Sequence, residues 1–181
     1  MFPIGMIHGR FQPFHNGHFD YLSQALQKSR HLFIGITNPD SSSVVEDNSD
    51  SHRHLASANP FPYYVRAQMI ARSIILNVEL SERINDITIV PFPISSPKLW
   101  KDYLPSNVVQ MIRLLDPWDN KKQAVFLEYR FEVVVLDGMR IVSGTEIRRD
   151  IDLKNNVWKE KVPTGSKHVI EDWLMQQPNF R

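Results

Sequence analysis

The sequence contains no cysteine, no long apolar run and almost no net charge, and each of these absences excludes a class of protein. Without cysteine, neither disulfides nor thiolate metal sites can form, which fits a reducing compartment. No stretch approaches the roughly 18 apolar residues of a membrane-spanning helix. The formal net charge of +1 argues against a broad electrostatic grip on nucleic acid. The start, MFPIGMIHGRF, lacks the basic segment of a signal peptide, so we expect a cytoplasmic protein.

The composition is that of a globular domain, with 42% hydrophobic and 23% charged residues. With 181 residues, we expect one domain over 1–181 that ends in a helical segment at about 152–181.

Short apolar runs alternate with segments of helical periodicity along the chain. We predict strands at 4–8, 31–37, 86–94, 107–115 and 131–137. We predict helices at 16–29, 63–78, 98–104, 118–130, 144–151 and 166–176. This alternation predicts an α/β fold, Rossmann-like with three layers (α/β/α) and a mainly parallel sheet of five or six strands. Residues 38–62 have no period and predict a long loop, either a solvated segment or a lid over anionic substrates.

The run GRFQPFHNGH (9–18) follows the first predicted strand, where such sheets bind ligands. Its polar or flexible members are Gly9, Arg10, His15, Gly17 and His18. The two histidines lie three residues apart at a predicted helix start, whose free amides favour an anion. A capping or surface role is the common alternative for such histidines. A metal site is disfavoured because no third ligand is evident and a helix N-terminus repels cations. The motif therefore predicts a phosphate site.

A second motif, SGTEIRR (143–149), follows the last predicted strand. Ser143 or Thr145 can cap a helix, and Glu146 is correctly spaced for a capping box with Ser143. That alone predicts only a good helix start. Arg148 adds a fork of donors for an anion held at the helix end.

Together the two motifs resemble the nucleotidyltransferase superfamily that carries the HxGH signature, here His15-Asn16-Gly17-His18. Within it, the chain is similar to archaeal-type nicotinamide mononucleotide (NMN) adenylyltransferases. The segment NPF (59–61) and Trp100, which follows PFPI, extend the similarity over most of the chain. The resemblance implies transfer of a nucleoside monophosphate from a triphosphate to a phosphorylated small molecule, with release of pyrophosphate. The specific reaction that the resemblance favours is adenylyl transfer from ATP to NMN in NAD synthesis.

The resemblance also implies roles for individual residues. The expected catalytic set is His15, His18, Arg10 and Arg148. The expected nucleotide-binding set is Gly9, Arg10, Phe11, His15, Gly17, His18, Ser143, Thr145 and Arg148. The expected acceptor-binding set is Arg66, Trp100, Asp116 and Trp118. Of these, Asp116 and Trp118 are not carried over from the family; they are included because they lie at the carboxyl end of a predicted strand, where they could contact either the base or the acceptor. Mg²⁺ is expected to bind through the nucleotide phosphates, with no metal site made by the protein itself.

The chemistry of these residue types agrees with such a transfer. An acceptor phosphate, with a second pKa of about 6, is already a dianionic nucleophile at neutral pH and needs no general base. The remaining task is to bring anions together and to stabilise the leaving pyrophosphate. Arginine, imidazole and helix-end amides do this by positioning and electrostatics.

The acceptor side departs from the family pattern. Pro97 stands where the archaeal-type enzymes have an asparagine, and DPWDNKK (116–122) replaces a Ser-Gly-Asn-Pro-like turn. A cytidylyltransferase that uses CTP and a phosphorylated or phosphonate acceptor is therefore the alternative, and a non-catalytic nucleotide-binding regulator is an alternative of another class. A class I aminoacyl-tRNA synthetase fragment is disfavoured, because no Lys-Met-Ser-Lys-Ser motif is present. The sequence leaves open whether the protein forms a homo-oligomer.

Overall fold

The computed structural model of the protein describes residues 1–40, 56–139 and 141–177, and it centres on one parallel sheet. The sheet has five strands in the order β3-β2-β1-β4-β5, and every pair of neighbours is parallel. The strands are β1 (Phe2–Gly9), β2 (Ser29–Thr37), β3 (Ile87–Phe92), β4 (Val109–Ile112) and β5 (Val133–Val135). The predicted parallel α/β fold is therefore confirmed, with five strands.

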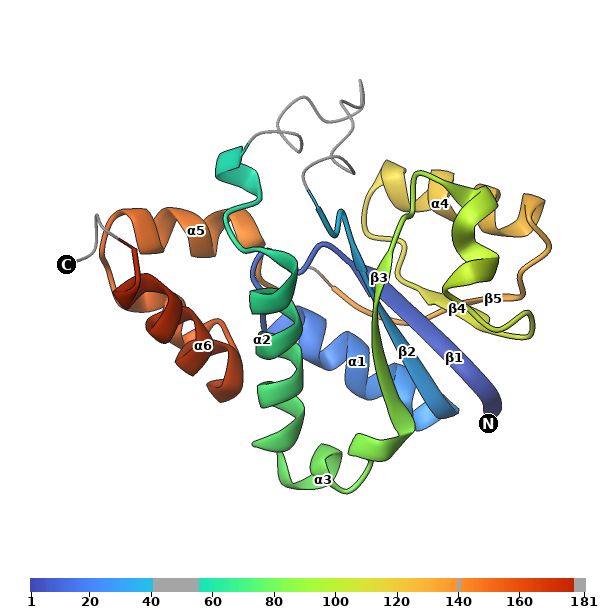
Figure 1. Ribbon diagram of the computed structural model, residues 1–181, viewed down its shortest axis with the longest axis horizontal. Coiled ribbons are helices and arrows are strands. Elements are labelled where there is room, and N and C mark those ends of the chain that lie inside the picture. Colours follow the sequence, from blue (N-terminus) through green and yellow to red (C-terminus); the bar gives the residue numbers. More distant parts are fainter. Residues whose placement is uncertain (41–55, 140, 178–181) are drawn as a thin grey trace.

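Helices cover both faces of this sheet (Figure 1). One face carries α1 (Asn16–Lys28), α2 (Tyr63–Ile75), α5 (Gly144–Asp152) and α6 (Thr164–Met175), whereas α4 (Pro117–Glu128) and the 3-10 helix η4 (Pro97–Asp102) cover the other. Four short helices complete the described part: α3 (Val78–Ser81) and the 3-10 helices η2 (Ala56–Ala58), η3 (Ile84–Asp86) and η5 (Val157–Glu160). Periodicity did not predict these, because single turns are too short to show a repeat.

Alternate residues of β1 serve two different cores. Ile7 packs into the cluster under α1 and α2, and Met6 packs into the aromatic cluster under η4 and α4. Both side chains are fully buried. A parallel strand covered on both faces is apolar throughout, which explains why the IGMI run reads as a continuous apolar stretch.

The strand order reverses at β1. The chain runs from β1 outward to β2 and β3, and then returns to the other side of β1 with β4 and β5. The connection after β1 (α1) packs on one face of the sheet, and the connection before β4 (η4) packs on the other, so the topology switches at β1. Ligands of such sheets bind at the carboxyl end of the strands at this point. That end carries the 9–18 motif.

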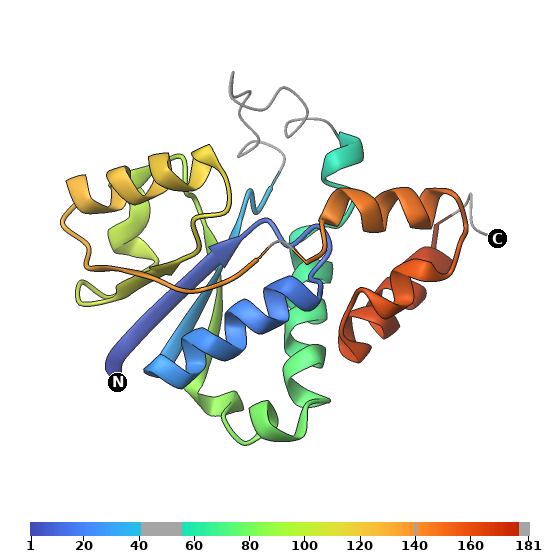
Figure 2. The ribbon, with the colours of Figure 1, turned by 180° about the vertical axis from the view of Figure 1, so that it is seen from behind.

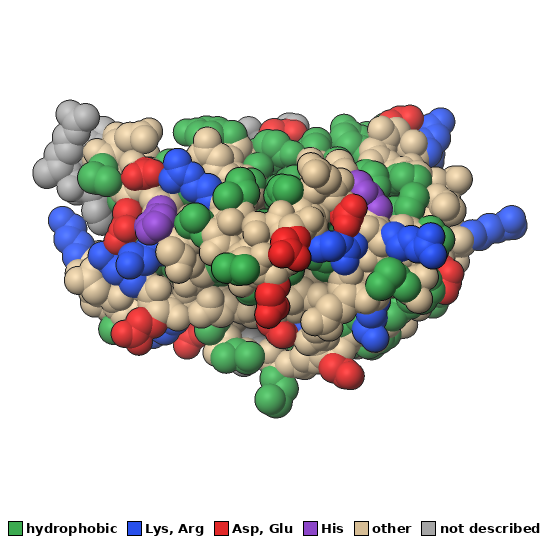
Figure 3. Space-filling view, turned by 90° about the horizontal axis from the view of Figure 1, so that it is seen from below, with side chains coloured by type: hydrophobic (Ala, Val, Ile, Leu, Met, Phe, Trp, Pro, Cys, Tyr) green, Lys and Arg blue, Asp and Glu red, His purple; other side chains and the backbone are tan. Residues whose placement is uncertain are grey.

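The opposite end of the molecule has a different surface (Figure 3). Acidic and basic side chains are intermixed there, and hydrophobic side chains are scattered among them. The turn from α2 to α3 contributes exposed Ile75, Leu76 and Val78. Charge of one sign does not gather on this face.

Candidate active site

The loop between β1 and α1 is held in place by buried side chains. Phe11, with a left-handed backbone (φ 53°), and Phe14 are both buried and lie 5.6 Å apart between ring centroids. The Gln12 amide donates to the carbonyl of Phe61 at 2.8 Å and accepts from its N–H at 3.0 Å. These contacts tie the loop to the segment before α2 and leave its backbone little freedom.

His15 and His18 cap the start of α1 reciprocally. His18 N–H donates to His15 Nδ1 at 3.3 Å, and His15 N–H donates to His18 Nδ1 at 3.4 Å. Since both Nδ1 atoms accept, each neutral ring must carry its proton on Nε2. The rings stack at 3.6 Å between centroids. The cap therefore fixes a pair of imidazoles that carry their N–H groups on Nε2.

The pKa of His18 indicates that this one ring is neutral. Its ring lies against Phe11 and Phe14 as well as His15. Burial lowers the pKa well below its ordinary 6.5, and the nearby charges of His15 and Arg113 lower it further. At neutral pH, His18 is a hydrogen-bond donor through Nε2 rather than a cation.

The first residues of α1 are fixed by the C-terminal part of the chain. Asn16 donates from its backbone N–H to Lys161 O at 3.0 Å and from its side chain to Glu160 O at 2.9 Å. A Cβ at Gly17 would lie 3.2 Å from the His15 ring, so glycine keeps the imidazole pair uncompressed. Residues 157–161 thus hold the helix start of the 9–18 motif in place. Nothing in the sequence pattern indicated this contact.

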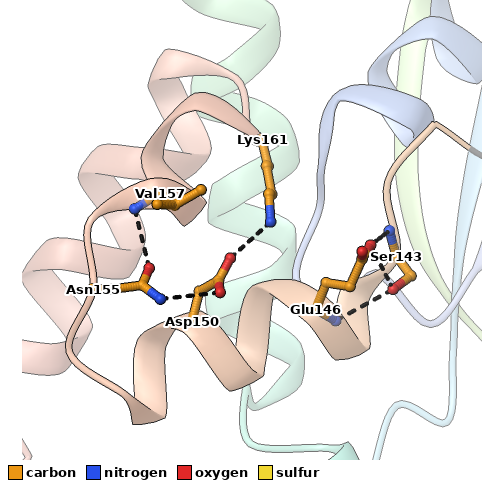
Figure 4. Close-up of polar contacts among 6 residues, drawn as sticks. All are labelled: Ser143, Glu146, Asp150, Asn155, Val157 and Lys161. Atoms are coloured by element: carbon orange, nitrogen blue, oxygen red, sulfur yellow. Dashed lines mark hydrogen bonds and ion pairs between the residues drawn. The ribbon is translucent and has the colours of Figure 1, made fainter.

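The second motif begins α5 as predicted. Ser143 Oγ accepts from Glu146 N–H at 3.2 Å, and the Glu146 carboxylate accepts from Ser143 N–H and Oγ, both at 3.0 Å (Figure 4). These bonds lower the pKa of Glu146. Further along α5, Asp150 accepts from Lys161 Nζ at 2.8 Å, which joins the helix to the segment that holds Asn16. The capping-box prediction for Ser143 and Glu146 is confirmed.

The two motifs meet at the start of α5 (Figure 2). Arg148 Nη1 donates to the carbonyl of Gln12 at 2.6 Å, and Nη2 donates to Thr145 Oγ1 at 3.1 Å. A Cβ at Gly144 would lie only 2.6 Å from the same Gln12 oxygen. Glycine at this position therefore allows α5 to rest directly on the loop of the first motif. The structure brings together the residues of the two predicted phosphate-binding motifs.

Arg66 connects the ends of two strands. Its side chain is buried and donates from Nη1 to Arg10 O at 2.9 Å and Thr37 O at 2.8 Å, and from Nη2 to Asn38 O at 2.8 Å. Burial lowers the pKa of Arg66 to about 10, which leaves it charged at neutral pH. Arg66 thus holds the Arg10 backbone from within, whereas contact with an acceptor stays a prediction. Arg10 itself reaches Asn59 Oδ1 at 3.5 Å.

Trp100 lies in the core beside η4. It is 1% exposed, its indole N–H donates to Pro93 O at 3.0 Å, and its ring contacts several aromatic rings. These belong to Phe92, Phe126, Tyr129 and Phe131. This position does not support the expectation that Trp100 stacks on an acceptor ring.

The other two expected acceptor residues lie at the start of α4. Asp116 is its N-cap and accepts from Asp119 N–H at 3.2 Å. Trp118 is in the first turn, but its side chain lies outside the described part of the structure. Of the 38–62 loop, residues 41–55 also lie outside it. The lid prediction and the acceptor role of both residues stay predictions.

Two residues that sequence reasoning missed lie at the strand ends. Arg113 follows β4, is buried, donates to Gly17 O at 3.1 Å and forms an ion pair with Asp20. His8 precedes Gly9 at the end of β1 and is buried. The sequence pattern that could have identified both residues is a polar residue directly after an apolar run.

The donors at this site are N–H groups and cations, which suit phosphate oxygens. Within residues 1–40, 56–139 and 141–177, no three His, Cys, Asp or Glu side chains gather in a way that could hold a metal ion. No helix in those ranges has the length and apolar character to cross a bilayer.

Residues 6–150 match the family model described as Cytidylyltransferase-like. The chain belongs to this family. A phosphonoformate cytidylyltransferase from Streptomyces viridochromogenes is 35% identical over 93% of this chain and 90% of its own length. A nicotinamide-nucleotide adenylyltransferase from Thermococcus kodakarensis is 29% identical over 93% of this chain and 82% of its own. The protein is therefore a nucleotidyltransferase, as the two motifs predicted.

A solved structure supports the fold of this nucleotidyltransferase. The bifunctional NMN adenylyltransferase/ADP ribose pyrophosphatase from Francisella tularensis, complexed with AMP and a manganese ion, superposes with a TM-score of 0.70. It is 19% identical, and the match covers 98% of this chain but 50% of that one. The likeness therefore concerns the fold.

Proposed function

We propose that this nucleotidyltransferase transfers a cytidylyl group from CTP to a small phosphonate or phosphorylated acceptor and releases pyrophosphate. The observation that carries the choice of acceptor is the burial of Trp100. Its ring is enclosed by aromatic neighbours and its N–H is already bonded, so it offers no surface to a nicotinamide ring. The 35% identity with a phosphonoformate cytidylyltransferase supports the same choice.

The proposed reaction needs no general base. An oxygen of the acceptor anion attacks the α-phosphorus of CTP, and the bond from that phosphorus to the bridging oxygen of pyrophosphate breaks. The electron pair of this bond leaves with pyrophosphate. A divalent cation carried by the triphosphate would neutralise part of the charge on the leaving group, in keeping with the lack of a carboxylate cluster in the described ranges.

The protein's own groups position the anions. The Nε2–H donors of His15 and His18 would contact the phosphates at the reacting centre, since their Nδ1 atoms are occupied by the helix cap. Arg10 and Arg148 would hold the triphosphate tail from the two motifs. These groups are set before substrate binds, which is how preorganised donors stabilise a developing charge.

Adenylyl transfer from ATP to NMN is the second candidate, because several relatives at 26–29% identity are nicotinamide-nucleotide adenylyltransferases. The experiment is a pyrophosphate-release assay with Mg²⁺ in which CTP and ATP are each paired with phosphonoformate, with NMN and with no acceptor. We expect release with CTP and phosphonoformate. Release with ATP and NMN alone would overturn the proposal in favour of the second candidate. Nucleotide binding by calorimetry without turnover in any pair would indicate a regulator.

A further inference from the structure

His8 is a buried imidazole without a hydrogen-bond partner. The residue is 6% exposed, and neither Nδ1 nor Nε2 has a partner in the described part of the chain. Buried polar groups in native proteins are almost always bonded, because an unmet donor or acceptor loses its hydration without compensation. Unpaired buried groups that persist therefore call for a ligand or a function.

Packing does not explain a histidine at this position. Its neighbours are the rings of Phe92, at 5.8 Å between centroids, and Phe126, at 5.1 Å. Met6, two residues earlier on the same face of β1, fills the adjoining aromatic cluster. An aliphatic side chain would suit these apolar surroundings better.

The ring is neutral in this environment. Burial lowers the pKa of His8 well below 6.5, and the positive charge of Lys122 on α4 lowers it further. Lys122 is itself paired with Asp119. A neutral imidazole has one N–H donor and one bare nitrogen acceptor, and both are unused here.

His8 lies beside the phosphate-binding motifs but on the other face of the sheet. It stands at the carboxyl end of β1, directly before Gly9 and Arg10, and faces α4. The imidazole pair of α1 and the start of α5 lie on the opposite face. A molecule that reacts with a triphosphate held by the two motifs can approach from the α4 side, where His8 is a buried polar group with neither ring nitrogen bonded.

We propose that His8 binds the acceptor and donates a hydrogen bond from its imidazole to an acceptor oxygen beside the carboxyl ends of β1 and β4. This assignment rests on the proposed function for the existence of a separate acceptor. It names a specificity residue outside both phosphate motifs. A small acceptor with a second oxygen-bearing group, such as the carboxylate of a phosphonoformate, matches the single donor of a neutral ring.

The test compares His8→Leu with His8→Gln. His8→Leu removes both nitrogens, and His8→Gln retains one donor and one acceptor group. We expect His8→Leu to raise the acceptor KM at least tenfold and to leave the CTP KM within twofold. His8→Gln should recover part of the loss. The melting temperature of His8→Leu should equal or exceed that of the wild type, because two unpaired polar atoms are removed.

Gln110→Met is the matched control. Gln110 on β4 is also fully buried with an unpartnered Oε1, but it pairs with Met6 in the middle of the sheet. Its replacement should leave the acceptor KM unchanged. An unchanged acceptor KM in His8→Leu, a change confined to the CTP KM, or an equal change in Gln110→Met would each overturn the role of His8.

The kinetics use whichever donor and acceptor the wild-type enzyme turns over. Turnover of ATP and NMN alone would refute the proposed function, and the acceptor KM of His8→Leu would still decide the role of His8 with that pair. A wild type that uses phosphonoformate, together with an unaffected His8→Leu variant, would refute only the role of His8.

Discussion

The contact between the two phosphate motifs depends on Gly144. A Cβ at this position would lie 2.6 Å from the Gln12 carbonyl oxygen and 3.2 Å from Arg148 Nη1, and real Cβ atoms essentially never approach closer than 3.0 Å. The obstructing atom belongs to the backbone of the first motif and cannot rotate away. In Gly144→Ala, either α5 or the loop must therefore shift.

The size of the effect follows from two opposing contributions. Overpacking of this kind costs about 1–3 kcal/mol. Alanine regains up to about 0.5–1 kcal/mol over glycine in a helix. We expect a net loss of roughly 0–2.5 kcal/mol, or up to several degrees in melting temperature for a chain of this size. A shift approaching 1 Å at the phosphate-binding groups should lower kcat/KM by about 10- to 100-fold.

Gly165→Ala is the control for stability. A Cβ at Gly165 would lie 2.3 Å from backbone atoms of Arg72 and Ser73, at the contact between α6 and α2. We expect a larger fall in melting temperature but a kcat/KM, per folded molecule, within about threefold of the wild type. Thermal unfolding and steady-state kinetics on both variants provide the comparison. Full activity in Gly144→Ala, or equal loss of activity in both variants, would refute the reasoning.

Three further variants or conditions test the site. Trp100→Phe should cost about 1–3 kcal/mol, because the smaller ring leaves unfilled volume among the aromatic neighbours of this buried side chain. It should leave the acceptor KM within twofold, and a tenfold rise would contradict the core position of this ring. His18→Ala should lower kcat by about 100- to 1,000-fold with little change in nucleotide affinity. The control, His31→Ala, is remote from the motifs and should change neither quantity. Comparable losses of rate and affinity in His18→Ala would count against a role of His18 at the reacting centre. Since His8 and His18 are held neutral with lowered pKa values, unfolding takes up protons below pH 6.5. The free energy of unfolding, measured by denaturant titration, should therefore be constant above that pH and fall between pH 6.5 and 5.5, and a flat profile would contradict the lowered values.

Local sequence patterns predicted the elements because their causes are local. Apolar runs and helical spacing located all five strands and the helices of more than one turn, with bounds that differ by a few residues. The capping box at Ser143 and the helix start at Asn16 were also readable, since each depends on residues within one turn.

Long-range contacts were not readable in this way. The sequence did not show that Trp100 packs among aromatic side chains from β3, α4 and the segment after α4. Nor did it show that Arg66 binds the carbonyls of three residues at the carboxyl ends of β1 and β2. Contact of either residue with an acceptor stays a prediction. In both cases the partners lie on other elements, so no spacing within the sequence identifies them.

The sequence by itself determined the class of chemistry. The order of strands and helices, the paired histidines at a helix start and the Ser-x-Thr-x-x-Arg group follow from residue types at short spacing, and they predict a phosphate site. The resemblance of these motifs to the HxGH nucleotidyltransferases then indicates nucleotidyl transfer. Only the tertiary structure decided the surroundings of the individual side chains. It placed Gly144 on the Gln12 carbonyl, enclosed Trp100 and left His8 unpaired at the end of β1. The reason is that hydrogen-bond satisfaction and burial depend on neighbours brought together by packing, which may lie more than a hundred residues away along the chain.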